Sequence, residues 1–248
     1  MFLQANYIFH PASERGRADH GWLKARYSFS FADWHDPEKM HFGALRVLND
    51  DGIGGGGGFG MHPHDNMEIV TIPLEGSLRH EDNMGHQSTI QAGDVQTMSA
   101  GRGVMHSEFN AHADHPVSLF QTWVFPSEKD LEPSYAQRSF SKSEKWNQLR
   151  CVVEPATIAE GEPGALKIHQ HAWYHLGDLE PGWTGEYALH GEGQGLYVFV
   201  IEGELMVDGH VLGPRDAIGV VGRPSVHLAA QATGKATSVL LIEVPMRW

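Results

Sequence analysis

Two short segments of the chain carry pairs of metal-competent side chains at a spacing of two: His62-Pro63-His64 and His106-Ser107-Glu108. On a β-strand, residues i and i+2 point to the same face, so each segment can direct both side chains into one cavity. Two such strands side by side would supply three imidazoles and a carboxylate to a single ion. Divalent iron, manganese, nickel, copper or zinc accepts this set and keeps positions free for a substrate or dioxygen. The spacing therefore predicts a chemically active metal site.

The histidine content alone would make a chance pair unsurprising, since 17 of the 248 residues are His. The surrounding sequence strengthens the interpretation. A glycine run, Gly54 to Gly58, precedes the first pair, and Met67 to Gly76 reads as a β-branched strand that ends in a turn. A second turn at Gln91 to Asp94 and the segment Ser99 to Gly103 then lead into the second pair. Strand, turn and candidate ligand recur in a fixed order.

Composition limits the classes of partner. The chain has 18 basic and 31 acidic residues, a net charge of -13 with neutral histidines, which disfavours direct nucleic-acid binding. No apolar run approaches the ~20 residues that a membrane-spanning helix needs. The first seven residues lack the features of a signal peptide, so we expect a cytoplasmic protein that does not associate with membranes. The single cysteine, Cys151, cannot form an internal disulfide.

The motifs together resemble a known superfamily. One set of residues has a spacing similar to the first motif of the cupins, in which antiparallel strands surround a metal: Gly60, His62, His64, Glu68 and Gly76. A later set is similar to the second motif: Gly93, Gly101, His106 and Asn110. More narrowly, the chain resembles the pirin family. The blocks that carry this resemblance are Asp19 to Leu23, Ser28 to Ala32, Gly43 to Asp51, His62 to His64, Met67 to Thr71 and Ser99 to Gly103. They are dense between about Gly16 and Pro126.

A faint internal repeat accompanies this resemblance. Leu74-Glu75-Gly76 returns as Ile201-Glu202-Gly203, and Val124-Phe125-Pro126 returns near Val244-Pro245, at offsets of around 120 residues. Such a period indicates two copies of one domain rather than a solenoid. We therefore expect an all-β bicupin: two antiparallel β-barrel (jelly-roll) domains packed together. The expected division is residues 1–130, which bind the metal, and residues 131–248, which lack a complete metal site.

The second copy contains fewer candidate ligands. His227 falls where His106 falls in the first copy, but the positions that answer to His62 and His64 lie near Leu189 and Gly191. The segment His169-Gln170-His171, with His175, could form another metal site, yet no partner strand with His or Glu is evident. A surface or inter-domain role is the stronger interpretation of these histidines, and a structural role is the stronger one for the second domain.

The fourth ligand of the first domain has two candidates. Many cupins use the Glu that follows the His pair, here Glu68, whereas the resemblance to pirin-like proteins implies Glu108. Strand parity places Glu108 beside His106, and we favour it. Glu68 lies four residues beyond His64 and could share that strand face, so it stays a candidate outer carboxylate or proton acceptor.

The family resemblance implies an activity. Bacterial pirin-like proteins resemble quercetin 2,3-dioxygenases, so we expect a metal-dependent oxidoreductase that acts on a flavonol with dioxygen. One divalent transition metal is expected, Fe(II) first, with nickel, copper, manganese, cobalt or zinc as alternatives. Glu108 or Glu68 would take the proton of the substrate hydroxyl. The alternative is an iron-containing regulator that binds protein partners without turnover. Two cupin domains in one chain can mimic a dimer, so we expect a monomer.

Overall fold

The computed structural model describes residues 6–232 and 234–248. The expectation about a signal peptide rests partly on residues 1–5, which lie outside the described residues. Strands dominate the described chain, and helices are limited to the 3-10 turn η1 (Ala12–Glu14) and the short α1 (Lys142–Lys145). No helix in these ranges is long and apolar enough to cross a membrane.

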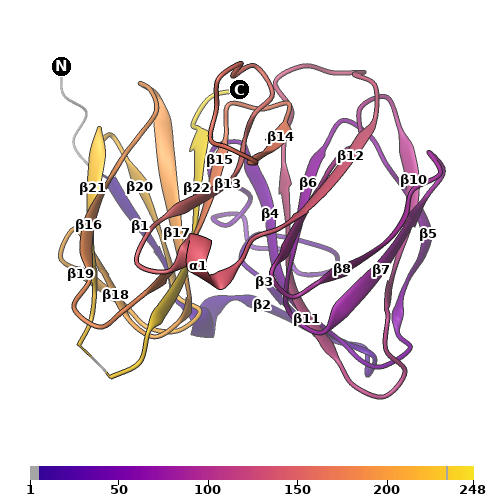
Figure 1. The fold of residues 1–248 in the computed structure, drawn as a ribbon, viewed down its shortest axis with the longest axis horizontal. Helices are drawn as coiled ribbons and strands as arrows, with labels where there is room; N and C mark the ends of the chain where they lie inside the picture. Colours follow the sequence, from indigo (N-terminus) through magenta and orange to yellow (C-terminus); the bar gives the residue numbers. More distant parts are fainter. Residues whose placement is uncertain (1–5, 233) are drawn as a thin grey trace.

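The first half of the molecule contains two sheets (Figure 1). A seven-stranded sheet has the order β12-β9-β6-β11-β4-β3-β2, and a four-stranded sheet has the order β5-β10-β7-β8. Their strands are β2 (Gly16–Asp19), β3 (Leu23–Tyr27), β4 (Leu45–Ile53), β5 (Gly58–His64), β6 (Glu68–Glu75), β7 (Ser77–Asp82), β8 (Gln87–Gln91), β9 (Asp94–Ser99), β10 (Val104–Asn110), β11 (Val117–Val124) and β12 (Ser134–Ser139).

The second half repeats this arrangement. Its seven-stranded sheet has the order β1-β20-β17-β22-β15-β13-β14, and its four-stranded sheet has the order β16-β21-β18-β19. The strands are β1 (Asn6–His10), β13 (Arg150–Pro155), β14 (Leu166–Ile168), β15 (Trp173–Leu179), β16 (Thr184–Ala188), β17 (Gln194–Glu202), β18 (Leu205–Val207), β19 (His210–Leu212), β20 (Ala217–Val221), β21 (Ser225–Ala230) and β22 (Thr237–Pro245). The all-β prediction and the prediction of two similar halves are confirmed. Each half is an open pair of facing sheets rather than a closed barrel.

The buried residues of the central strands show how the halves join. On β4, Leu45 and Leu48 belong to an apolar core shared by both seven-stranded sheets, while Ile53 belongs to the core inside the first half. The shared core includes the fully buried rings of Phe120, Tyr174, Tyr197 and Phe199. Each such ring contributes about 1.5–3 kcal/mol by leaving water. The two halves are therefore joined by a substantial apolar contact.

Two strands lie in the sheet of the opposite half. β1, from the beginning of the chain, pairs antiparallel with β20, from Asn6 opposite Val221 to His10 opposite Ala217. β12, which follows residue 130, pairs antiparallel with β9, from Ser134 opposite Ser99 to Ser139 opposite Asp94. In Figure 1, the indigo β1 accordingly lies among the orange strands. The strand pairing does not follow the division at residue 130, and the division into these two domains stays a prediction.

The repeat also shows why the second half differs at the expected ligand positions. On β21, His227 pairs with Glu186 of β16, and both side chains are exposed, whereas the neighbouring Val226 and Tyr187 are buried. The apolar core of this half includes Leu228, the residue that follows His227. His227 therefore faces solvent, unlike its counterpart His106.

Candidate metal centre

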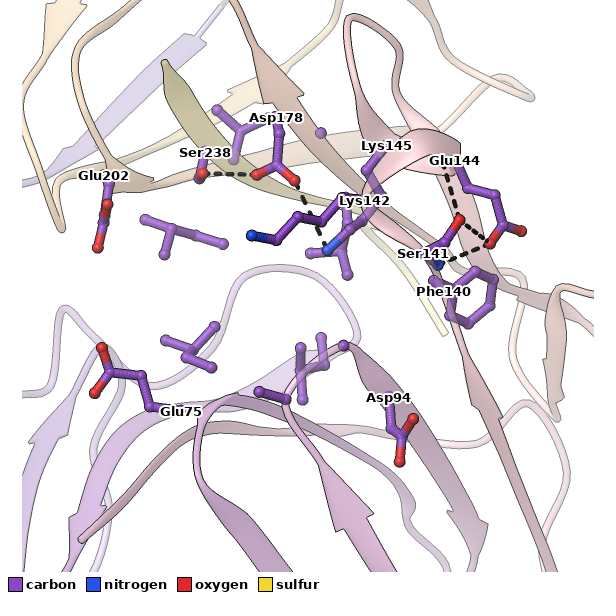
Figure 2. A pocket seen from close by; sticks show the side chains of 18 of the residues that line it. Glu75, Asp94, Phe140, Ser141, Lys142, Glu144, Lys145, Asp178, Glu202 and Ser238 are labelled. Atoms are coloured by element: carbon purple, nitrogen blue, oxygen red, sulfur yellow. Dashed lines mark hydrogen bonds and ion pairs between the residues drawn. The ribbon is translucent and has the colours of Figure 1, made fainter. Parts of the chain in front are cut away.

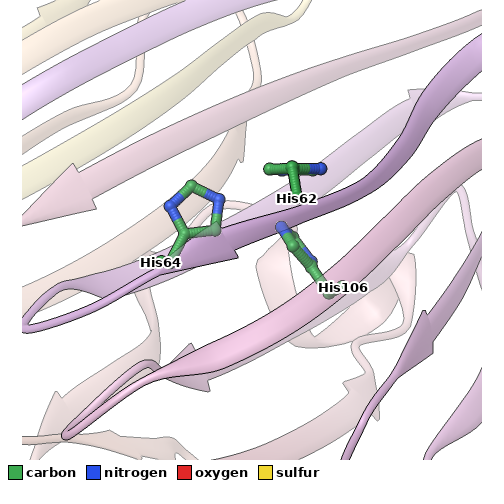
Figure 3. A group of neighbouring side chains, drawn as sticks. All are labelled: His62, His64 and His106. Carbon is green, nitrogen blue, oxygen red and sulfur yellow. The ribbon is translucent and has the colours of Figure 1, made fainter.

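Pairing of β5 with β10 brings the three predicted histidines together. His62 is the direct cross-strand partner of His106, and Val104 is the partner of His64. The ring centroids lie 4.4 Å apart for His62 and His106, and 4.9 Å apart for His64 and each of the other two. Figure 3 shows these side chains converging from the two strands. One nitrogen of each ring lies within 4.8 Å of one nitrogen of the other two.

Metal binding requires neutral imidazole rings. His62 Nδ1 lies 2.8 Å from the Gly60 carbonyl oxygen, and because that oxygen only accepts, Nδ1 is the donor and Nε2 is the nitrogen that a metal ion could bind. Burial, followed by the neighbouring His62, lowers the pKa of His64 to about 4. Burial lowers the pKa of His106 to about 2, with further contributions from His62, His64 and His80. His64 and His106 are therefore neutral near pH 7.

The fourth predicted ligand, Glu108, lies next to His106 but in a second group. One carboxylate oxygen of Glu108 and one ring nitrogen each of His106 and His80 lie within 4.8 Å of one another. The three predicted histidines form a separate group by the same distance. The register of β10 against β5 shifts between His106 and Glu108, a local irregularity that re-aims side chains. Burial raises the pKa of Glu108, while hydrogen bonds from Gln121 lower it. The two groups share His106, so the four predicted residues are adjacent but not all within one group.

His80, which the sequence interpretation did not single out, completes the second group. It lies fully buried on β7, and its Nε2 is 3.1 Å from the Asp82 carboxylate. Asp82 also accepts from the Met84 and His86 backbone N–H groups and interacts with His86 Nδ1 at 2.9 Å. Asp82 thus occupies His80 Nε2, whereas His80 Nδ1 is buried and has no hydrogen-bond partner. The segment His80-Glu81-Asp82 has the same spacing of two as the predicted pairs, a signal that could have revealed it.

Glu68 lies elsewhere, and the expectation that it shares a strand face with His64 is wrong. A turn with Asn66 at φ 46° ends β5, and β6, which carries Glu68, belongs to the other sheet. The Glu68 carboxylate accepts from Ser99 Oγ at 2.6 Å and from the His169 backbone N–H at 3.1 Å. Val70, two residues on, packs in the core between the halves. Glu68 therefore links the two halves, away from the three histidines.

Buried polar groups continue inward from the histidines. Asn49 Oδ1, Asp51 Oδ1, Thr71 Oγ1 and both amide atoms of Gln96 are buried without hydrogen-bond partners. Burial, and then the charges of Asp50 and Glu108, raise the pKa of Asp51 to about 8. Such groups are normally paired with protein or ordered water. The interior of the first half is therefore polar at the level of the candidate site.

The histidines of the second half form no comparable group in the ranges that the structure describes. His175 is buried on β15 and lies 3.4 Å from the Tyr187 hydroxyl. Tyr187 donates to the buried Glu243, which also interacts with His190. His169 uses its backbone N–H to bind Glu68. These side chains are accounted for by hydrogen bonds within the fold.

A cavity of about 1000 Å³ lies between the two halves (Figure 2). Glu75 and Glu202, which hold equivalent positions in the internal repeat, lie on opposite walls of it (Figure 2). Lys142 and Lys145 of α1 lie near its other end, and Lys145 is 3.8 Å from Asp178. None of the candidate metal ligands lines this cavity. It is separate from the histidine cluster.

The donor set of the cluster fits a transition metal. Both ring nitrogens of His106, together with His80 Nδ1, are buried and lack any hydrogen-bond partner. An unpaired buried polar atom is costly, and a metal ion would supply the missing partner. Neutral imidazoles beside a carboxylate suit iron, nickel, copper or zinc. His62, His64 and His106 converge as one candidate ligand set, and His80, His106 and Glu108 form a second set that shares His106.

Comparison with known proteins places the chain in a family. The Pirin family profile matches residues 9–124, and the profile of the quercetinase C-terminal cupin domain matches residues 158–244. A quercetin 2,3-dioxygenase of Escherichia coli K12 is 37% identical over 234 residues, covering 94% of this chain and 96% of the relative. A pirin-like protein of Caulobacter vibrioides is 38% identical, covering 89% and 93% respectively. The chain belongs to the pirin family. The predicted bicupin fold is thereby confirmed.

A solved pirin structure extends the comparison to metal. The bacterial pirin YhhW of Escherichia coli in complex with nickel(II) matches this pirin with a TM-score of 0.88 and 34% identity. The match covers 97% of this chain and 99% of that one. A quercetin 2,3-dioxygenase of Acinetobacter baumannii, at 18% identity and a TM-score of 0.74, shares the fold. A metal centre in the pirin described here is consistent with both the relatives and its own donor set.

Proposed function

We propose that this pirin is a metal-dependent dioxygenase that acts on flavonols such as quercetin. The observation that carries the proposal is the convergence of three imidazoles, two of them held neutral by burial, beside the buried carboxylate of Glu108. The names of the relatives support the same activity. We propose Fe(II) as the native ion and a monomer in the cytoplasm as the working form.

Bound at this site, the metal would supply a Lewis acid that favours the ionised form of a substrate hydroxyl. The protein side chains would hold the ion in place and accept the proton of the substrate. His62, His64 and His106 hold fixed positions on two paired strands, so no rearrangement of the backbone is needed to present them. Glu108 is the residue that we propose as the proton acceptor, because its raised pKa brings it closer to that of a phenolic hydroxyl.

The surroundings suit an aromatic substrate. Phe59 lies with its ring centroid 6.3 Å from that of His62, and the Trp123 ring lies edge-on to His64 at 4.9 Å. Aromatic side chains favour a flat apolar ring.

The test is aerobic decay of quercetin, followed by absorbance. Protein is loaded separately with Fe(II), Ni(II), Cu(II), Mn(II) or Co(II), and a His62→Ala variant is the control. We expect decay that requires both the metal and His62. A fully metal-loaded protein that leaves quercetin unchanged in air would refute the proposal and favour the alternative, an iron-containing regulator that binds protein partners.

A further inference from the structure

Gln121 on β11 binds both oxygens of Glu108. Its Nε2 donates to Glu108 Oε1 at 3.0 Å and to Oε2 at 2.8 Å. Glu108 is buried, and no other protein hydrogen bond to its carboxylate is found in the described part of the chain. A single amide group therefore fixes where this carboxylate lies.

Trp123 fixes the orientation of that amide. Its indole Nε1, which can only donate, lies 3.2 Å from Gln121 Oε1. The oxygen of the amide must therefore face Trp123, which leaves the NH₂ group facing Glu108. The side chains of Gln121 and Trp123 share a strand face, because Thr122 between them points to Tyr174 in the core between the halves.

Trp123 also touches a second candidate ligand. Its ring lies edge-on to His64, with centroids 4.9 Å apart, and edge-on to Phe31 at 5.3 Å. One side chain thus contacts His64 directly and reaches Glu108 through Gln121. These two ligands come from different strands, β5 and β10, and β11 of the facing sheet connects them.

We propose that Gln121 and Trp123 form a positioning pair that sets the geometry of Glu108 and His64 for the metal. Partners that orient ligands in this way commonly change metal affinity 10- to 100-fold when they are removed. The inference rests on the proposed metal site. It extends that site to two residues that would not themselves bind the ion.

The test measures Ni(II) affinity by competition with a chelator, in wild type, Gln121→Leu and Trp123→Phe. We expect about 10- to 100-fold weaker binding for Gln121→Leu. Trp123→Phe keeps a ring against His64 but lacks the donor, and we expect a smaller loss in the same direction. Gln96→Leu is the matched control, since Gln96 is a buried glutamine of the same interior with no partner, and its Ni(II) affinity should equal that of wild type.

A double-mutant cycle separates positioning from general damage. In a Glu108→Ala background, Gln121→Leu should cause no further loss of Ni(II) affinity, and the Co(II) visible spectrum of Gln121→Leu should approach that of Glu108→Ala. An equal loss in both backgrounds, or wild-type affinity in Gln121→Leu, would overturn the inference. Thermal midpoints of the metal-free variants show whether each is folded. Quercetin turnover enters none of these readouts, so failure of the proposed activity would be seen separately.

Discussion

His62 on β5 and His106 on β10 are direct cross-strand partners whose ring centroids lie 4.4 Å apart. Two imidazolium ions could not be held so close in a buried site, because like charges at this distance repel strongly. Burial lowers the pKa of His106, so this ring of the pair is neutral near pH 7. Both ring nitrogens of His106 are buried without a hydrogen-bond partner, which costs free energy in the folded state. A metal ion bound between the two rings would remove this cost by accepting a nitrogen lone pair.

Replacing His106 by Ala should weaken Ni(II) binding more than about 100-fold, since even outer-shell changes cost 10- to 100-fold. His62→Ala should have a similar effect. The measurement is metal content after dialysis against a chelator. His227→Ala is the control, because His227 holds the equivalent place in the second half and faces solvent. Equal metal content in the His106 and His227 variants would contradict the assignment.

Glu68→Ala should destabilise the fold without changing metal affinity. It leaves two buried donors, Ser99 Oγ and the His169 N–H, without their acceptor, at a cost of about 1–3 kcal/mol each. The midpoint of urea unfolding measures the loss. Glu75→Ala, on the exposed end of the same strand, should leave that midpoint unchanged. A Glu68→Ala variant that keeps its stability but loses the metal would restore Glu68 as a ligand.

Stability should fall as the pH drops below about 6.5, in part because of His10. Burial, and then the charge of Lys39, lower its pKa from 6.5 to about 4. Between these values the unfolded chain takes up a proton that the folded chain does not, so the contribution is present above pH 6.5 and declines toward pH 4. At pH 5 the decline is on the order of 1–2 kcal/mol.

Urea unfolding at pH 7.5 and pH 5 tests this contribution. His10→Asn should show a smaller difference between the two midpoints than the wild type, even though it also loses the 2.8 Å contact of His10 with the Tyr197 hydroxyl. His20→Asn, at an exposed position, should keep the wild-type difference. An unchanged difference in the His10 variant would refute the prediction.

Deleting residues 1–10 should lower the thermal midpoint by at least about 5 °C, because the deletion removes β1 and exposes the edge of β20. Metal affinity should not change, since β1 lies in the half without the histidine cluster. Differential scanning calorimetry and a Ni(II) titration measure the two properties. A truncated chain with an unaltered midpoint would show that β1 adds little to stability.

The histidine cluster was predictable from sequence because strand parity is a local rule. A spacing of two places His62 beside His64, and His106 near Glu108, on any strand. The same rule failed for Glu68, because it was applied across the turn at Asn66 into a strand of another sheet. Parity holds only within one strand.

Features that depend on contacts between distant segments were not predictable from one sequence. Gln121 meets Glu108 because β11 and β10 lie in facing sheets, and no spacing along the chain encodes that contact. The division at residue 130 follows the internal repeat, whereas the pairing of β1 with β20 and of β12 with β9 depends on which sheet edges are open. His80 was predictable only in part. Its spacing of two from Asp82 is visible in the sequence, but its proximity to His106 depends on the pairing of β7 with β10.

The exchanged strands have a thermodynamic consequence. When the second half unfolds, β1 loses its partner β20 and the first half loses the shared core. When the first half unfolds, β12 loses its partner β9. Unfolding should therefore be a single cooperative event. An ion that binds only the folded histidine cluster would then raise the unfolding free energy of the entire chain, including strands that never approach it.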